Sequence, residues 1–301
     1  MAVKDDIKDG KTMSDAVDLL KTIQSSFYKL SKGQKSIAQY LMNNYDKAAF
    51  MTAAKLGEKV GISESTVVRF ANAIGFTGYP ELQKQLQEMV KTRLTTVQRI
   101  EMSNEYSTDE STLKNILKAD MENIHLTLEE IDQASFDEVV KKILEAKSIY
   151  IIGLRSSTAL AEFFGFYLNW VRDNVHVVTY TLGDIFEQLF RVGPEDLVIG
   201  IGFPRYSSRT IKALEYCKGK SAGVVAVTDS LLSPLCTNSD YSLIAKSKME
   251  SFVDSIVAPM SVLNALIVAT GMKEKKKLSE SFESLEDIWD RFNIYSKDTI
   301  K

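Results

Sequence analysis

The chain has 301 residues, of which 45% are hydrophobic and 26% charged, and this composition excludes a largely disordered protein. It is long enough for two domains. The formal net charge of −3 divides unevenly, because residues 1–95 carry 14 Lys and Arg against 10 Asp and Glu, while the remainder carries 23 against 30. The N-terminal third, at +4, is therefore the part whose charge suits nucleic acid.

Cysteine and histidine are too sparse for a disulfide framework or a zinc site, since each occurs only twice, as Cys217 and Cys236 and as His125 and His176. We expect a cytoplasmic protein with reduced thiols and with no metal or cofactor. The first twenty residues lack the apolar core of a signal peptide. The most apolar run, residues 256–270, is short for a membrane span and is interrupted by a proline, so it predicts a buried helix and no membrane partner.

The first domain is predicted to be all-helical and to cover residues 16–94. Residues 1–13 are charged and without pattern, which indicates a frayed end. Apolar residues then recur at helical spacing. The predicted elements follow in order: a helix over 16–30, a second helix around 37–41 that residues 43–45 end, a helical motif over 53–72, a turn over 75–80 and a helix over 81–94.

Residues 53–72 predict a helix-turn-helix. Gly61 supplies the positive φ of the turn, and Ser63 is a good N-cap for the second helix. Six apolar positions are expected to close one small core: Leu56, Val60, Ile62, Val67, Phe70 and Ala71.

Four side chains near the start of the second helix are left facing outward, where a recognition helix enters the major groove: Glu64, Ser65, Thr66 and Arg69. Arg69 is expected to contact phosphate or guanine, and Ser65 and Thr66 to contact the DNA backbone or base edges. Ser63 would hold the helix start. Glu64 either reads cytosine or complements the helix dipole.

Residues 95–112 are polar and predict a linker, and residues 113–292 predict a second domain of α/β type. Two helices, over 113–131 and 136–146, are expected before the pattern changes to alternating strands and helices. That alternation favours a five-stranded parallel sheet covered on both faces by helices, which makes three layers. The predicted strands are 148–152, 175–180, 196–201, 223–228 and 241–245. The predicted helices are 158–171, 184–191, 208–217, 233–238, 252–271 and 278–292, with a solvated loop at 273–277.

Two loops of this domain have the composition of an anion site. Residues 153–158 leave the first strand and residues 202–210 leave the third, and each combines hydroxyls, an arginine and the start of a helix. Neither loop matches a P-loop or a dinucleotide fingerprint, so a nucleotide is disfavoured. The alternative for each loop is an ordinary helix cap.

Other candidates have structural interpretations beside a functional one. Gly183 and Asp184 open a helix as a cap or as ligand contacts, and Asp254, in the segment 250–255 that is expected to start a helix, suits the helix dipole. His176 lies by a strand and is interpreted as structural. Five aromatic residues are expected in the core and at a subunit interface: Phe163, Phe164, Phe166, Tyr167 and Trp170.

The helix-turn-helix with V-V-R-F, the following G-F-T-G-Y-P-E-L and the α/β half together resemble the RpiR/MurR transcriptional regulators, over about residues 16–292. The resemblance implies a helix-turn-helix domain followed by a sugar isomerase (SIS) domain that binds a phosphosugar and dimerises. It also implies double-stranded DNA as a partner. Since operators mirror protein symmetry, we expect a dimer or tetramer on an inverted repeat.

Carried over residue by residue, the resemblance places ligand contacts on the two loops and on the segment after the fifth strand. The implied residues are Gly153, Ser156, Ser157, Ser207, Ser208, Thr210, Glu250 and Ser251, with Tyr206 in the same loop. Arg155 and Arg205 stand where the family has small residues. Either they bind a more anionic ligand than a sugar monophosphate, or an arginine fills the phosphate position and leaves no ligand.

Two alternatives to a ligand-controlled regulator remain. The first is a phosphosugar isomerase or lyase, which needs a base beside the reacting carbon, and Glu250 and Glu187 are the candidates near the predicted site. The second is a DNA-binding protein whose SIS domain only oligomerises. No catalytic residue is predicted, and the sugar, the operator and the sign of regulation are left open.

Overall fold

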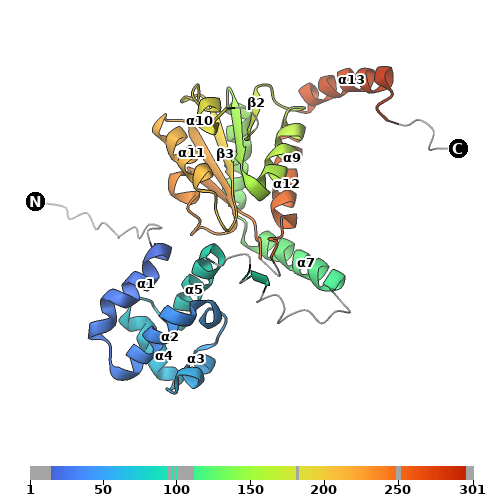
Figure 1. Cartoon of the computed structure of the whole chain (residues 1–301). Helices are drawn as coiled ribbons and strands as arrows, with labels where there is room; N and C mark the ends of the chain where they lie inside the picture. Colours follow the sequence, from blue (N-terminus) through green and yellow to red (C-terminus); the bar gives the residue numbers. More distant parts are fainter. Residues whose placement is uncertain are drawn as a thin grey trace, which may run out of the picture. The chain divides into compact units, whose positions relative to one another are not determined.

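The computed structural model describes residues 15–93, 97, 99–100, 112–180, 183–248 and 252–295. The chain separates into two compact units, Met1–Glu101 and Met102–Lys301. The described part of the first unit is all-helical, as predicted (Figure 1). Its elements are α1 (Asp15–Ser26), η1 (Phe27–Lys29), α2 (Lys32–Ala48), α3 (Ala53–Val60), α4 (Glu64–Ala73) and α5 (Tyr79–Arg93).

Helix boundaries in the first unit follow local hydrogen bonds, and two differ from the prediction. Residues 43–45 do not end α2; Asn44 leaves helical geometry (φ −141°, ψ 38°) and its amide donates to the Tyr40 carbonyl at 3.3 Å, after which the helix continues to Ala48. The expected turn over 75–80 is shorter, because α5 already begins at Tyr79. The Glu81 side chain accepts from the Thr77 backbone N–H at 2.7 Å and holds this helix start.

The second unit is built on a five-stranded sheet with the order β2-β1-β3-β4-β5, in which every pairing is parallel. This confirms the predicted α/β class and all five predicted strands, with ends that differ by a residue or two. The strands are β1 (Ile149–Gly153), β2 (Val175–Val178), β3 (Leu197–Ile201), β4 (Gly223–Thr228) and β5 (Tyr241–Ile244). Strands β1 and β3 are fully buried, as near-continuous apolar runs of a covered parallel sheet should be.

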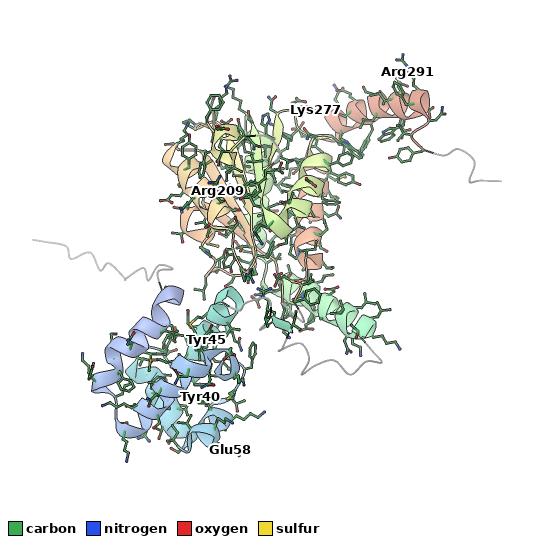
Figure 2. The ribbon with its side chains drawn as sticks, in the orientation of Figure 1. Tyr40, Tyr45, Glu58, Arg209, Lys277 and Arg291 are labelled. Carbon is green, nitrogen blue, oxygen red and sulfur yellow. The ribbon has the colours of Figure 1, made fainter. Side chains whose placement is uncertain are left out.

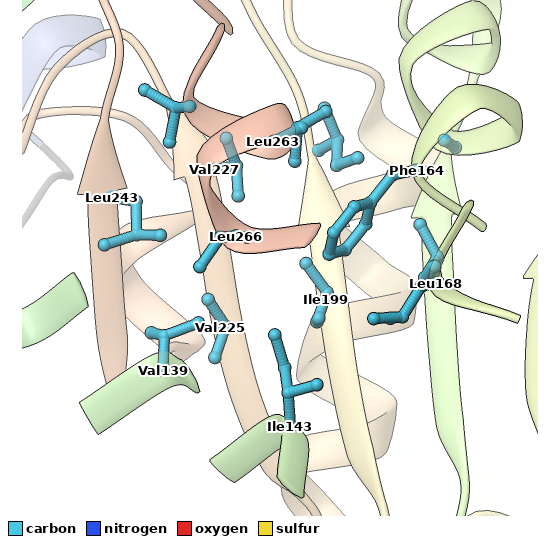
Figure 3. Packing of buried hydrophobic residues seen from close by; sticks show 14 of the residues in the cluster. Val139, Ile143, Phe164, Leu168, Ile199, Val225, Val227, Leu243, Leu263 and Leu266 are labelled. Atoms are coloured by element: carbon cyan, nitrogen blue, oxygen red, sulfur yellow. The ribbon is translucent and has the colours of Figure 1, made fainter. Parts of the chain in front are cut away.

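Helices cover both faces of the sheet, which makes three layers. One face lies under α8, α9 and α12, and Figure 3 shows their apolar side chains meeting the strands around Phe164 and Ile199. The opposite face lies under α10 and α11. The helices are α7 (Thr112–Glu130), α8 (Gln133–Glu145), α9 (Thr158–Leu168), α10 (Ile185–Gln188), α11 (Ser208–Gly219), α12 (Val257–Lys273) and α13 (Lys275–Phe292).

Three expectations for the C-terminal region are wrong. The segment 250–255 does not start the long helix, because residues 252–256 are non-helical and α12 begins at Val257, so Asp254 does not complement a helix dipole. Lysines 275–277 form the first turn of α13 rather than a loop, and Lys277 pairs with Asp173 at 2.6 Å. Residues 233–238 contain only one 3-10 turn, Cys236–Asn238.

The aromatic cluster of α9 is only partly core. Phe164 is buried, but Trp170 packs edge-on against Phe282 and Trp289 of α13, at ring distances of 5.5 and 6.0 Å. The C-terminal helix thus gives the cluster a partner within the same chain. Among the described residues, no helix is both long and apolar enough to cross a membrane.

Candidate functional site

The turn of the helix-turn-helix depends on two glycines. Gly61 ends α3 in the left-handed region (φ 75°, ψ 36°), which a side chain would disfavour. The Ile62 N–H then donates back to the Gly57 carbonyl at 2.8 Å. A Cβ atom on Gly57 would lie 2.8 Å from the Ile62 carbonyl oxygen, so the two helices approach this closely only because residue 57 has no side chain.

Ser63 occupies the N-cap position of α4, but its side chain does not cap the helix backbone. Its hydroxyl instead lies 3.0 Å from the Ser65 hydroxyl and 2.9 Å from the Thr66 hydroxyl. Ser63 and Ser65 are exposed and Thr66 is half-buried. The start of α4 therefore presents a group of three linked hydroxyls, suited to phosphate oxygens and base edges.

The remaining predicted DNA contacts also lie on the open side of α4. Arg69 is exposed, and its Nε donates to the Ser65 carbonyl at 3.2 Å, one turn earlier. Glu64 is exposed in the first turn, while Val67 and Phe70 are buried on the other face. The structure thus gathers Ser63, Glu64, Ser65, Thr66 and Arg69 in the N-terminal half of α4 and its cap, a group that we call the α4 face.

Helix α5 fixes the segment that leads into α3. The Tyr79 hydroxyl donates to the Met51 carbonyl at 2.7 Å, and the Gln83 amide donates to the same carbonyl at 2.9 Å. The Gln87 amide donates to the Ala49 carbonyl at 3.1 Å. Burial raises the pKa of Tyr79 to about 12, so the phenol stays protonated and remains a donor across the physiological range.

Strand order brings the two predicted anion-binding loops together. From β1 the chain crosses to β2 on one side and later returns to β3 on the other side of β1, so β1 and β3 are neighbours, with Gly153 paired to Ile201. In open α/β sheets this reversal of strand order is where ligands bind, beyond the carboxyl ends of the strands. Residues 153–158 and 202–210 leave the sheet there and are called the switch-point loops.

The first loop is tightly wound. A Cβ atom on Gly153 would lie 2.5 Å from the Ser157 carbonyl oxygen, so the fold requires glycine here. Arg155 adopts a positive φ of 60° and is exposed, as is Ser156, whereas Ser157 is buried. The Thr158 hydroxyl donates to the Gly153 carbonyl at 3.1 Å and closes the loop onto the strand end.

The second loop begins α11 with a side-chain cap. The Ser207 hydroxyl accepts from the Thr210 N–H at 3.3 Å, so Ser207 caps α11. The helix-cap interpretation of this loop is therefore correct for Ser207, and a ligand contact by the same hydroxyl stays a prediction. Ser208 and Arg205 are exposed. Thr210 is buried, and its hydroxyl has no hydrogen-bond partner among the described residues. A buried hydroxyl without a protein partner is the group that a ligand oxygen would satisfy.

A third loop belongs to this region and was missed from the sequence. Asp229, directly after β4, is buried and accepts from the Tyr206 hydroxyl at 2.7 Å. The buried Thr228 hydroxyl lies 2.8 Å from the Ser233 hydroxyl. The signal was present as T-D-S at the end of a predicted strand next to the third one. Because Tyr206 is held through Asp229, the second switch-point loop is positioned by the loop after β4.

The loop after β2 is connected to α11 by charge. Arg209 pairs with Asp184 and lies over the Phe186 ring, 5.4 Å from its centroid (Figure 2 labels Arg209). Asp184 caps α10, accepting from the Phe186 N–H at 3.0 Å. This N–H and Arg209 hold the pKa of Asp184 below its usual value. Asp184 is thus a cap and an ion-pair partner.

The other candidates lie apart or outside the described residues. His176 stacks on Tyr150 on β2 and β1, with ring centroids 4.9 Å apart, away from the loops at the strand ends. The Glu187 carboxylate accepts the Asp184 N–H at 2.8 Å, which commits it to the helix cap. Glu250 and Ser251 fall outside the described residues.

Fold and sites together define a two-domain protein with a helix-turn-helix DNA-binding domain and a sugar-isomerase-type α/β domain. A model described as "Helix-turn-helix domain, rpiR family" matches residues 17–93, and a SIS domain model matches residues 142–269. The chain therefore belongs to the RpiR family of transcriptional regulators, as the resemblance predicted.

Relatives and solved structures agree with this membership. An uncharacterised HTH-type transcriptional regulator of Haemophilus influenzae is 26% identical over 78% of this chain and 82% of its own length. The HTH-type transcriptional regulator HexR of Escherichia coli is 22% identical over 90% of this chain and 94% of its own length.

Two solved structures share the fold. The sugar isomerase domain of an RpiR transcription factor from Sphaerobacter thermophilus is 25% identical, with a TM-score of 0.57, and covers 59% of this chain and 99% of its own. The Vibrio vulnificus NanR protein, solved with ManNAc-6P, is 18% identical, with a TM-score of 0.54, and covers 91% of this chain and 98% of its own.

Proposed function

We propose that this regulator binds an operator through the α4 face and that its SIS domain binds a phosphorylated sugar or a related anionic metabolite, which changes operator affinity. One observation carries the proposal: the chain joins the α4 face to two loops, at the strand-order reversal of a SIS sheet, that offer hydroxyls and arginines. Hydroxyls at helix starts and guanidinium groups are the donors that phosphate prefers. The NanR structure with ManNAc-6P supports this ligand class by analogy.

The ligand site would be formed by both switch-point loops. Ser156 and Ser208 offer exposed hydroxyls, and the buried Thr210 hydroxyl offers a donor or acceptor. Arg155 and Arg205 add positive charge at the exposed edge. Gly153, Ser157, Tyr206 and Ser207 would shape the loops, and Glu250 and Ser251 are proposed to complete the site.

The test is a thermal-shift panel of phosphosugars and sugar acids on the full chain. We expect a hit that is lost in Thr210→Val and Ser208→Ala and kept in Ser284→Ala, an exposed serine of α13. Arg155→Ala and Arg205→Ala separate the two roles of the arginines. If the arginines bind the ligand, removing either side chain weakens ligand binding. If one of them fills the phosphate position, removing that side chain strengthens or creates ligand binding. No shift with any compound would favour a SIS domain that only oligomerises.

On the DNA side, we propose a dimer or tetramer that binds an inverted repeat in the cytoplasm. Full-length protein used to select sequences from a random duplex library should enrich an inverted repeat. Enrichment of single half-sites would contradict the symmetric arrangement.

The enzyme alternative rests on the SIS fold alone. Its candidate base Glu187 already accepts the Asp184 N–H, which leaves it poorly placed to take a substrate proton. Conversion of a sugar phosphate by the purified chain, abolished in Glu250→Gln, would establish an enzyme instead.

A further inference from the structure

Helix α7 exposes apolar side chains that a folded domain normally buries. Leu113, Met121 and Leu128 are 73%, 69% and 74% exposed, and Leu117 and Ile124 are also exposed. At 100° per residue, these five positions fall on one side of the helix. We call this surface the α7 stripe. Monomers rarely expose a continuous apolar surface of this kind without a partner for it.

Polar residues hold α7 to its own domain along a different side. Asn123 and Thr127 are buried; the Asn123 amide oxygen accepts from the Lys248 N–H at 3.0 Å, and the Thr127 hydroxyl accepts from the Lys246 N–H at 2.8 Å. The Ser255 hydroxyl donates to Asp120 at 2.6 Å. The helix is therefore fixed to the segment between β5 and α12 by hydrogen bonds, and its stripe is not the surface that anchors it.

The charges beside the stripe identify the partner. The first half of α7 carries Lys114 and Lys118, and the second half carries Glu122 and Glu129. All four are exposed and lie on the same side of the stripe, with Lys114 next to it and Glu122 furthest round the helix. Two copies of α7 packed antiparallel bring their charged sides to the same edge, with the lysines of each copy near the glutamates of the other. A parallel two-fold pair would place the two charged sides on opposite edges of the interface and would leave these charges unpaired.

The spacing of the stripe is also compatible with a two-fold axis. Leu113 and Leu117 precede the helix centre by nearly the distances at which Leu128 and Ile124 follow it, with Met121 close to the centre. We infer that the α7 stripe pairs with the α7 stripe of a second copy of this chain, antiparallel about an axis near Met121. The inference rests on the chain pairing in the proposed function and assigns its surface.

This pairing would set the spacing of the two DNA-binding units. Thr112, where α7 begins, lies nine residues before Met121. Antiparallel packing therefore places the two Thr112 residues about 27 Å apart along the helix axes, at 1.5 Å per residue. The half-sites of an inverted repeat lie one helical turn apart, about 34–36 Å.

The assembly state of the full chain tests this inference, measured by sedimentation velocity over a range of concentrations. We expect a dimer or larger assembly whose dissociation constant rises at least 100-fold in Met121→Glu and Leu117→Glu. Phe190→Glu, at another exposed apolar side chain of the same domain, should leave the assembly unchanged. Circular dichroism checks that each variant is folded.

Two further variants keep the inference falsifiable if a glutamate unfolds the helix. Met121→Cys should form a disulfide-linked dimer under mild oxidation, while Phe190→Cys and the wild-type chain, with its native Cys217 and Cys236, should not. Lys114→Glu should weaken the dimer about three- to tenfold, and adding Glu129→Lys should restore it.

An assembly that survives Met121→Glu, with no cross-link in Met121→Cys, overturns the inference; if that assembly still binds an inverted repeat, the proposed function stands. A wild-type chain that is monomeric at all concentrations, its stripe covered by the N-terminal unit or by nothing, overturns both the inference and the paired operator.

Discussion

The α4 face and the switch-point loops use similar residues, serine, threonine and arginine at helix starts, but they are assembled differently. All five residues of the α4 face lie within residues 63–69, at the N-cap and in the first two turns of one helix, and the turn that presents them is set by Gly57 and Gly61. The switch-point region draws on loops after β1, β3 and β4, up to 80 residues apart, which meet only because of the strand order.

This difference predicts how each site fails. A surface on one helix depends on a local turn, so damage to the turn should remove DNA binding and spare the other unit. A site made of several loops depends on buried polar contacts between them, such as Tyr206 with Asp229. Damage to such a contact should alter ligand affinity while the sheet persists.

Gly57→Ala should have the largest effect and should break the α4 face alone. The new methyl group meets the Ile62 carbonyl oxygen at 2.8 Å, so α3 and α4 must separate, at a cost of about 1–3 kcal/mol to the N-terminal unit. Calorimetry should show that unit melting earlier and the SIS domain unchanged, with DNA binding lost. Gly33→Ala is the matched control, because its Cβ meets only methyl groups, at an ordinary 3.6 Å.

Tyr206→Phe tests the assembled region. It removes a donor that lies 2.7 Å from the buried Asp229 carboxylate and should cost the SIS domain about 1–3 kcal/mol, because a buried carboxylate oxygen loses a hydrogen bond. Affinity for a ligand hit should fall while DNA binding without ligand is unchanged. Tyr216→Phe, on α11 of the same domain, is the control. Equal ligand affinity in Tyr206→Phe and wild type would show that the β4 loop does not position the site.

Tyr79→Phe sharpens the comparison through pH. The hydroxyl donates to Met51, which keeps Gln83 as a second donor, so the loss should be only about 1 kcal/mol. Since the pKa of Tyr79 is raised to about 12 from 10.0, its neutral form stabilises the fold fully below pH 10, and this contribution is lost as pH rises toward 12. The free energy of unfolding of the N-terminal unit, measured by denaturant titration between pH 9 and 12, should fall more steeply with pH in the wild type than in the variant.

Arg69→Ala should have the smallest effect, seen as a change in salt dependence. If Arg69 contacts one phosphate, the slope of log K against log salt should fall by about 0.9, with little change in thermal stability. Arg69→Lys should largely keep the slope. If Arg69→Ala keeps the wild-type slope of log K against log salt and binds only some DNA sequences more weakly, Arg69 contacts a base rather than a phosphate.

Most elements were predictable because their patterns are local. The helix-turn-helix has its turn glycine and apolar spacing within twenty residues, and each strand is a short β-branched run between turns. The errors lie where distant contacts decide. Asn44 interrupts α2 without ending it, and α12 starts late because the preceding segment is tied to α7 through Ser255 and Lys248.

The candidate site residues also divide into those with local signals and those without. Ser63–Arg69 could be predicted from the sequence of one helix, and the two switch-point loops from the residue types at the ends of the predicted strands. Asp229 and Thr228 were missed, because the role of a carboxylate after a strand can be predicted only when the neighbouring strand, and so the contact with Tyr206, is known. Arg155 and Arg205 were recognised as departures from the family pattern, and the structure shows both exposed, but their contacts with a ligand stay a prediction.

By itself the sequence determined the two-domain organisation, the helix-turn-helix and the α/β class, because periodicity, turn glycines and charge act over short spans. Only the tertiary structure decided which loops meet at the reversal of strand order, that Tyr206 is held by a buried Asp229, and that α7 turns an apolar stripe to solvent. The physical reason is that amphipathic spacing shows which residues share a side of a helix, while the contacts of the whole fold decide which side is covered.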